Sequence, residues 1–222
     1  MKILFVLDQL PYPPRNGVTI PTFNYMSRLA SQFDVSILYV NKDKDQASYY
    51  QLPENKRYVR NLWTIEPFRA SRSRRIKDEL LLNKPYFLGW SCDSTKLRNL
   101  LCGQSFDVVW GSPLNVTETV TLISEILGPH PIYVAGINDC RTSVYRNMGK
   151  RFLVKELDIQ TRPRYALAWL RSWLIGPMEA RLLEKYNLIL VQTHAEKEWL
   201  NRISYGKLNG RTMILSNGVN ET

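Results

Sequence analysis

An aspartate follows a long apolar run in a position suited to chemistry. The run covers residues 131–137, and Asn138, Asp139 and Arg141 come directly after it. A carboxylate at the end of a buried strand can orient a ligand hydroxyl or stabilise developing positive charge. We therefore predict Asp139 to be catalytic, as the only carboxylate placed directly at the end of a central strand, with Asn138 and Arg141 as ligand contacts. The alternative role for Asp139 is that of a helix N-cap, which aspartate often fills.

A second group of candidate residues lies in the loop 8–18, after the first apolar run. Asn16, Gly17 and Val18 precede Thr19, which we predict to be a helix N-cap with a proline close behind it. A glycine lets a ligand approach the backbone, and the amino end of a helix offers N–H groups to an anion. The loop therefore predicts ligand binding, although a tight turn before a helix explains the same residues. No G-x-G-x-x-G pattern follows the first strand, which argues against NAD.

Two further loops contribute single candidate residues. Ser112 follows the apolar stretch that ends at residue 111, and His194 lies just after the stretch 187–192. We predict that both contact a ligand. The spacing of Thr193 and Glu196, three residues apart, matches a helix capping box, so these two residues are assigned a structural role.

The elements that must hold these loops are alternating strands and helices. Apolar, β-branched runs predict strands at 2–7, 35–40, 58–65, 106–111, 131–137, 187–192 and 212–216. Two of the connections contain apolar residues at helical spacing, at Phe23, Met26, Ala30 and Phe33 and at Val116, Val120, Ile123 and Leu127. This alternation predicts an α/β fold, with a Rossmann-like, doubly wound, mainly parallel sheet of about seven strands flanked by helices. The longer segments 41–56 and 66–105 are expected to hold extra helices.

Size and composition agree with one packed domain. The chain has 222 residues, of which 44% are hydrophobic. No apolar run approaches the roughly 20 residues that span a bilayer, and the stretch after Lys2 is too short for a secretory signal, so we predict a cytoplasmic protein. Cys92, Cys102 and Cys140 are odd in number and widely spaced, which fits reduced thiols better than disulfides or a metal site.

The positive charge is concentrated in two segments. Residues 69–84 carry six basic and two acidic residues, and residues 141–173 carry eight basic and two acidic ones, which together account for the formal net charge of +10. The second segment has the composition of an interfacial helix on anionic lipid. Its predicted membrane-facing residues are Arg162, Arg164, Trp169, Arg171 and Trp173. The alternative is that its apolar stripe packs on the sheet while the arginines are solvated.

The order and spacing of several segments resemble a known family. They are K-I-L-F-V at 2–6, P-Y-P-P at 11–14, N-G at 16–17, L-N-K-P-Y at 82–86, F-D-V-V-W at 106–110 and L-I-L-V-Q-T at 188–193. Over nearly the whole chain they resemble the amino-terminal, acceptor-side domain of retaining glycosyltransferases of the GT-B fold. The resemblance is to the family 4-like enzymes of lipopolysaccharide, exopolysaccharide and phosphatidylinositol mannoside synthesis.

The resemblance implies a role for each matching position. Asn16, Gly17 and Val18 would lie under the diphosphate of a nucleotide-sugar donor, although many members have two adjacent glycines where this chain has Gly17 and Val18. Asp139 would lie near the transferred sugar, and no metal or other cofactor is expected. Residues 1–216 would form the first domain, and 217–222 would begin a linker to a carboxyl-terminal, donor-binding domain outside this chain.

The implied function is sugar transfer to a glycan or lipid-linked acceptor in cell-surface polysaccharide synthesis, on the inner face of the cytoplasmic membrane. This chain alone is expected to be inactive. Two other classes share some of these features. A basic nucleic-acid-binding module would need a recognition motif, which this sequence lacks, so nucleic acid is not expected as a partner. A non-catalytic α/β ligand-binding domain would explain the strand-end loops without catalysis.

Overall fold

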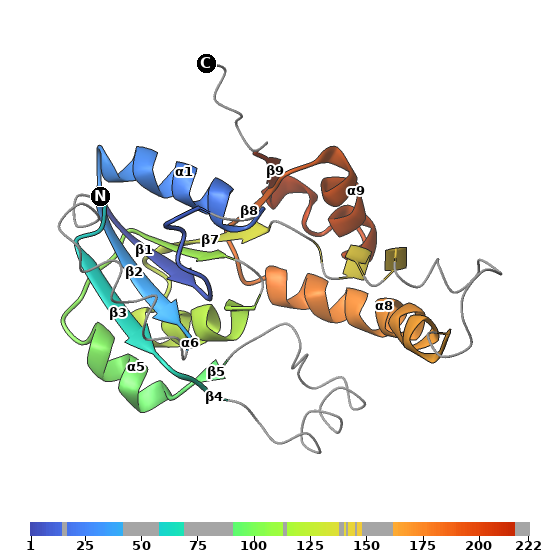
Figure 1. The fold of residues 1–222 in the computed structure, drawn as a ribbon, viewed down its shortest axis with the longest axis horizontal. Helices are drawn as coiled ribbons and strands as arrows, with labels where there is room; N and C mark the ends of the chain where they lie inside the picture. The colour runs from blue at the N-terminus through green and yellow to red at the C-terminus, as the bar shows by residue number, and fades with distance from the viewer. Residues whose placement is uncertain are drawn as a thin grey trace.

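Seven parallel strands form the central sheet of the molecule (Figure 1). A computed structural model describes residues 1–14, 17–41, 58–68, 91–112, 115–137, 140, 142–144, 146–147 and 162–215. The strand order is β3-β2-β1-β6-β7-β8-β9, and every pairing in this sheet is parallel. The predicted fold class is thereby confirmed. The strands are β1 (Lys2–Leu7), β2 (Asp34–Val40), β3 (Asn61–Ile65), β6 (Val108–Ser112), β7 (Ile132–Ile137), β8 (Leu188–Val191) and β9 (Thr212–Ile214).

Helices cover both faces of the sheet because alternate strand residues point to opposite sides. In β1, Ile3 and Phe5 enter one apolar cluster, whereas Leu4 and Val6 enter the other. The first cluster includes Met26 of α1 (Thr19–Ala30). The second, larger cluster includes residues of α5 (Ser94–Leu101), α6 (Thr117–Leu127), α8 (Arg162–Leu183) and α9 (His194–Ile203). The apolar residues that were predicted at helical spacing, in the connection from β1 to β2 and in that from β6 to β7, all pack in these clusters.

Two short strands outside the main sheet were not predicted. β4 (Pro67–Phe68) pairs antiparallel with β5 (Ser91–Cys92). Strands of two residues show no periodicity, so sequence pattern cannot reveal them. The predicted helix within 66–105 is confirmed by α5, whereas the prediction for 41–56 falls almost entirely outside the described residues.

The connections of the sheet change direction between β1 and β6. From β1 the chain moves outward to β2 and β3, then returns to β6 on the other side of β1 and continues through β7, β8 and β9. In open α/β sheets, ligands bind beyond the carboxyl ends of the strands at such a switch point. The register pairs Leu7 of β1 with Ser112 of β6, so the loops that follow these two residues begin side by side.

Tyr186 fills the core behind β6. Its side chain is buried, and its hydroxyl would lie 3.2 Å from a Cβ built on Gly111, while Val120 would lie 2.8 Å from that Cβ. A glycine at position 111 therefore makes room for α6 and Tyr186. Burial raises the pKa of Tyr186 well above its ordinary value of 10.0, although a hydrogen bond with Thr117 lowers it in part.

We expect this shift to make the protein less stable at alkaline pH. As pH rises through the unfolded-state pKa of about 10, the unfolded chain loses the Tyr186 proton while the folded protein keeps it. The free energy of unfolding therefore decreases above that pH, and below that pH Tyr186 does not change it. Tyr25, Tyr133 and Cys92 are shifted in the same direction. Tyr186→Phe should therefore reduce, without abolishing, the alkaline slope of stability in urea unfolding between about pH 8 and pH 11. An unchanged slope would contradict the assignment.

Candidate functional site

A buried carboxylate lies at the switch point of the sheet. Asp8 follows β1 directly and is 3% exposed. The side-chain amide of Asn115 donates a hydrogen bond of 2.7 Å to Oδ2 of Asp8, and the side-chain amide of Asn41 donates one of 2.8 Å to the Asp8 backbone oxygen. Asn41 follows β2 and Asn115 follows β6. Asp8 therefore ties together the loops that leave three adjacent strands.

The position of Asp8 shows that one prediction made from the sequence is wrong. Asp139 was predicted to be the only carboxylate directly at the end of a central strand, and this is wrong because Asp8 follows Leu7 in a strand of the same kind. The signal was present in the apolar run of residues 3–7. It was missed because Asp8 was assigned to the proline-containing loop rather than to the strand end.

The amino end of α1 lies in the same loop. The helix begins at Thr19 with Val18 as its N-cap, so the predicted capping role of Thr19 is wrong. Val18 has no side-chain oxygen with which to cap the helix, and its carbonyl accepts a hydrogen bond of 2.8 Å from the hydroxyl of Thr22. The first turn of α1 contains no acidic residue that would repel an anion. Binding of an anion at this helix end remains a prediction.

The glycine in this loop is not explained by the backbone or by packing. A Cβ built on Gly17 would meet none of the described atoms within 4 Å, and its φ lies outside the left-handed region that favours glycine. A tight turn alone therefore does not require a glycine at position 17. The open space above it is what the approach of a ligand to the backbone would need.

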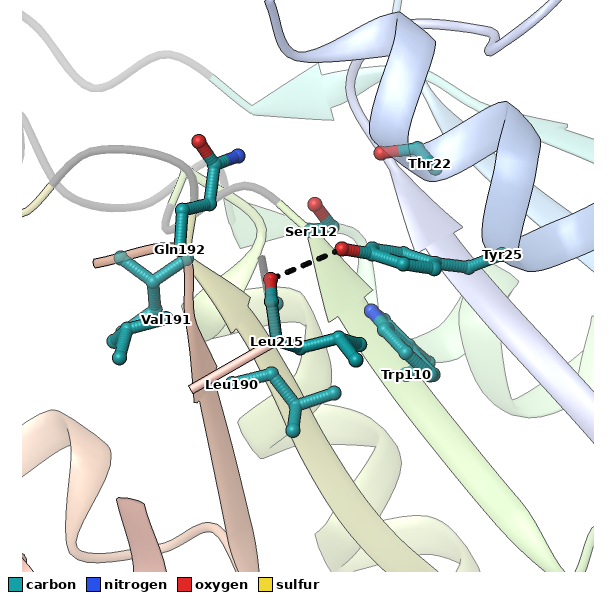
Figure 2. A pocket seen from close by; sticks show the side chains of 10 residues that line it. Thr22, Tyr25, Trp110, Ser112, Leu190, Val191, Gln192 and Leu215 are labelled. Atoms are coloured by element: carbon teal, nitrogen blue, oxygen red, sulfur yellow. Dashed lines mark hydrogen bonds between the residues drawn. The ribbon is translucent and has the colours of Figure 1, made fainter. Parts of the chain in front are cut away.

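A pocket opens beside the switch point, at the carboxyl ends of β6, β7 and β8 (Figure 2). Its free volume is about 10 Å³, which is room for about one water molecule. Trp110 and Ser112 of β6, Gly136 of β7 and Gln192 after β8 contribute to its walls. Tyr25 of α1 closes one side, where its hydroxyl donates a hydrogen bond of 3.2 Å to the backbone oxygen of Leu215.

The predicted site residues fall into two groups. Ser112 is buried in this pocket, and Gly17 and Val18 belong to the loop that begins at Asp8 on the same edge of the sheet. His194 is exposed as the first residue of α9, after β8. The remaining predicted residues lie outside the described part of the chain, so their proximity to Gly17 stays a prediction; they are Asn16, Asn138, Asp139 and Arg141.

The capping box before α9 is confirmed. The backbone N–H of Glu196 donates to the hydroxyl of Thr193 at 3.2 Å, and the backbone N–H of Thr193 donates to the Glu196 carboxylate at 3.0 Å. This reciprocal pair satisfies two donors at the helix end. Thr193 and Glu196 therefore have the structural role that their spacing predicts.

A second buried carboxylate was not anticipated. Glu179 of α8 is fully buried and accepts a hydrogen bond of 3.0 Å from the backbone N–H of Thr142. The hydroxyl of Thr142 donates to the same carboxylate oxygen. Thr142 opens the helical segment 142–144, shortly after β7. Glu179 therefore fastens α8 to the chain that leaves the carboxyl end of β7.

Two tryptophans of α8 face solvent. Trp169 is 41% exposed and Trp173 is 66% exposed, and their rings make an edge contact with centroids 6.1 Å apart. The side chains of Arg162, Arg164 and Arg171 lie outside what the structure describes. The predicted membrane-facing surface is therefore observed only through its aromatic residues, and its contact with a membrane stays a prediction.

Three negative observations apply to the described residues alone. They contain no group of three or more His, Cys, Asp or Glu side chains placed to hold a metal ion. None of their helices is both long enough and apolar enough to cross a membrane. None of the three cysteines forms a disulfide, and Cys92 and Cys140 are buried whereas Cys102 is exposed.

Comparison with solved structures found proteins of similar architecture, although no protein-family model matches this chain and no curated protein is similar to it in sequence. The Anabaena protein HepE, crystallised with UDP-glucose, matches 99% of this chain over 44% of its own length, with a TM-score of 0.51 and 13% identity. A UDP-glucosyltransferase from Polygonum tinctorium matches 98% of the chain over 52% of its own length, with a TM-score of 0.45 and 11% identity. The chain thus spans about half the length of either protein. The likeness to HepE shows a shared Rossmann-like fold.

Proposed function

We propose that this chain is the acceptor-side domain of a retaining, family 4-like GT-B glycosyltransferase. The enzyme would transfer a sugar from a nucleotide-sugar donor to a glycan or lipid-linked acceptor in cell-surface polysaccharide synthesis. The observation that carries the proposal is the arrangement of residues at the edge of the sheet where the carboxyl ends of the strands lie. There the buried Asp8, the open backbone at Gly17 and a pocket containing Ser112 meet around the switch point, on a fold shared with a protein crystallised with UDP-glucose.

Each part of this edge has a role in the proposed reaction. Sugar transfer requires the leaving diphosphate to be held by positive groups while the acceptor hydroxyl is brought to the anomeric carbon. Asn16, Gly17 and Val18 would face the diphosphate at the amino end of α1. Asp139, with Asn138 and Arg141, would act near the transferred sugar, and Ser112 and His194 would contact the substrates. The nucleotide sugar is a substrate, and the mechanism needs no cofactor or metal.

We further propose that a carboxyl-terminal domain of the same protein forms the other side of the substrate-binding cleft. We expect the 222-residue chain alone to transfer no sugar. A polypeptide extended past Thr222 by its own reading frame is expected to transfer one. The test assays both polypeptides with a panel of UDP-, GDP- and ADP-sugars and a lipid-linked acceptor. If the extended protein is inactive with every donor, sugar transfer is refuted. If both polypeptides turn over the substrates equally, the carboxyl-terminal domain is not required for transfer.

Gly17→Ala tests the open space above the glycine loop. The added methyl group meets no described atom, so we expect an unchanged melting temperature. In the extended protein the methyl group would meet the donor, and a loss of about tenfold in kcat/KM corresponds to about 1.4 kcal/mol of transition-state binding. Gly210→Ala is the matched control, because a Cβ there is equally unhindered and the residue lies in the 3-10 turn Asn209–Arg211, away from this edge. Equal activity of the two variants would contradict the proposed contact.

We also propose that the amino half of α8 rests on an anionic membrane surface. Trp169 and Trp173 are exposed, and this helix begins within the segment 141–173 that carries eight basic and two acidic residues. Aromatic side chains with basic neighbours suit the interface of anionic lipid, where each basic residue contributes about 1 kcal/mol. The protein would then be cytoplasmic and peripherally attached to the inner face of the membrane.

Liposome sedimentation measures this attachment. We expect binding to vesicles that contain anionic lipid, weakened by salt because the attraction is electrostatic. Trp169→Ala with Trp173→Ala should weaken binding, and so should Arg162→Gln, Arg164→Gln and Arg171→Gln together. Tyr205→Ala is the control, because Tyr205 is 89% exposed but lies outside α8. Equal binding to neutral and anionic vesicles, or none at low salt, would refute the proposal.

A further inference from the structure

Two arginines lie against one tryptophan of α9. The guanidinium carbon of Arg146 lies 4.7 Å from the centre of the Trp199 ring, and that of Arg202 lies 5.9 Å from it. Trp199 and Arg202 belong to α9, whereas Arg146 lies in the helical segment 146–147, after β7. Two positive charges from separate segments are therefore neighbours on one aromatic ring.

The fold holds this group of side chains in place. Trp199 is half-buried and packs against the larger apolar cluster. Arg146 follows Thr142 by about one helical turn, and the backbone N–H and hydroxyl of Thr142 both donate to the buried carboxylate of Glu179 in α8. The segment that carries Arg146 is thus fastened to α8, and the ring on which Arg146 lies is fastened to the core.

The hydrogen-bonding groups of both guanidiniums remain available. A guanidinium that lies over an aromatic ring is attracted through its charge and keeps its N–H donors for other partners. Among the described residues, no carboxylate forms an ion pair with Arg146 or Arg202, and no acceptor takes a hydrogen bond from either side chain. Glu198, about one turn before Arg202 on α9, is exposed. The pair therefore presents two unneutralised charges with free donors.

Helix electrostatics explains only half of this arrangement. Arg202 lies in the last turn of α9, where the helix dipole favours a positive charge, but Arg146 comes from another segment. Two like charges held side by side repel one another, and a bound anion would remove that cost. A carboxylate has two oxygens, which a single guanidinium can occupy by itself. A phosphomonoester has three oxygens and a charge of about −1.5 to −2 at neutral pH, so it suits two guanidiniums.

We propose that Arg146 and Arg202 together bind the phosphate group of a phosphomonoester, with Trp199 holding the two guanidiniums at a fixed separation. The phosphate belongs either to a lipid headgroup or to a soluble compound, because both present the same three oxygens. None of these three residues is part of the site proposed for sugar transfer. The inference can therefore be tested without a sugar donor.

An NMR titration of the 222-residue chain with glycerol 3-phosphate tests the site. The chain has six tryptophans, and the indole N–H signal that is missing in Trp199→Phe identifies Trp199. We expect glycerol 3-phosphate to shift this signal, and acetate at the same ionic strength to bind at least tenfold more weakly. Absence of binding by glycerol 3-phosphate would overturn the proposal, and so would equal binding of acetate.

Substitutions of the two arginines locate the phosphate. Arg146→Gln and Arg202→Gln each remove charge-assisted hydrogen bonds, so each should weaken glycerol 3-phosphate by roughly tenfold or more. Arg98→Gln is the matched control, because Arg98 is an exposed arginine in the last turn of another helix, α5. If the Arg98→Gln variant lost as much affinity as the two others, the binding would reflect overall charge and the proposal would be wrong.

Substitutions of the ring separate a built site from a simple basic surface. Trp199→Leu leaves both arginines in the chain but removes the aromatic face, so it should weaken glycerol 3-phosphate by about two- to tenfold. Trp199→Phe keeps an aromatic face and should retain more of the affinity. Melting temperatures show that each variant is folded. Full affinity in a folded Trp199→Leu protein would overturn the role of the ring.

Vesicle sedimentation identifies the source of the phosphate. Phosphatidic acid presents a phosphomonoester and phosphatidylglycerol a diester, so vesicles of the two lipids are matched for surface charge. If the ligand is a lipid headgroup, the protein prefers phosphatidic acid, and Arg146→Gln with Arg202→Gln removes the preference. If the ligand is soluble, both vesicles bind equally while glycerol 3-phosphate still binds to the two arginines. Attachment through α8 alone responds to surface charge and is the same for both vesicles.

Discussion

Replacing Glu179 with alanine is expected to lower the free energy of unfolding by about 2–4 kcal/mol, because two buried donors lose their acceptor at once. The backbone N–H and the hydroxyl of Thr142 both donate to one oxygen of this carboxylate. Glu179 and Thr142 are each fully buried, so water cannot replace the lost acceptor. The N–H in question also begins a helical segment, where a negative group is favoured by the helix dipole.

Urea unfolding of matched variants measures this effect. Glu179→Gln keeps the shape of the side chain and one acceptor oxygen, so it should cost less than Glu179→Ala. Thr142→Val removes the hydroxyl and keeps the backbone donor, which predicts a loss of about 1 kcal/mol. Glu125→Ala is the control, because Glu125 is an exposed helical glutamate whose removal should stay within about 0.5 kcal/mol. If Glu179→Ala were no more destabilising than Glu125→Ala, this contact would have no stabilising role.

The buried contact of Glu179 could not be predicted from the sequence, whereas the strands could. The strands could be predicted because runs such as residues 3–7 and 132–137 are apolar on both faces, as a buried parallel sheet requires. A glutamate in a helix among basic residues looks like part of a solvated surface, whatever its true environment. Gly176, one turn earlier, lies close to the same partner of Glu179, because a Cβ there would lie 3.5 Å from Thr142 and 3.3 Å from Ile203. Such a three-way contact between distant segments has no local sequence pattern.

The candidate site also contains some residues that the sequence could predict and others that it could not. Ser112 and Gly17 could be predicted as candidates because Ser112 ends a strand and Gly17 lies in a loop that follows one, and parallel strands bring such positions to one edge. Asp8 was overlooked although it follows a strand, and its importance depends on Asn41 and Asn115, which are 33 and 107 residues away in sequence. Trp110 and Tyr25 were not predicted either, because an aromatic residue in a strand or helix usually indicates core packing. Only the pairing of β6 with β7 places Gly136 beside Trp110, where the absence of a side chain makes room for the edge of the indole.

Asp8→Ala is expected to reduce sugar transfer by the extended protein about 100-fold, because a shift of about 1 Å in a positioning group can have that effect. Asp8 is nearly fully buried, and it joins the loop containing Gly17 to the loops after β2 and β6. Without its carboxylate the side-chain amide of Asn115 loses this acceptor, which removes one link between the loop after β6 and the loop after β1. The loss should appear in kcat more than in the KM of either substrate, since positioning rather than binding is affected.

A double-mutant cycle decides whether this contact is the cause. The free energies of unfolding of Asp8→Ala, Asn115→Ala and the double variant should give a coupling energy of about 0.5–3 kcal/mol, as expected for residues in one hydrogen bond. Asp8→Asn keeps an oxygen that can accept from Asn115, so it should retain most of the stability and show whether the charge matters for transfer. Additive free energies, together with normal kcat in Asp8→Ala, would mean that the bond of 2.7 Å between these side chains positions nothing. Coupling in stability with a matching fall in kcat would instead identify the switch point as the part of the fold that aligns the substrates.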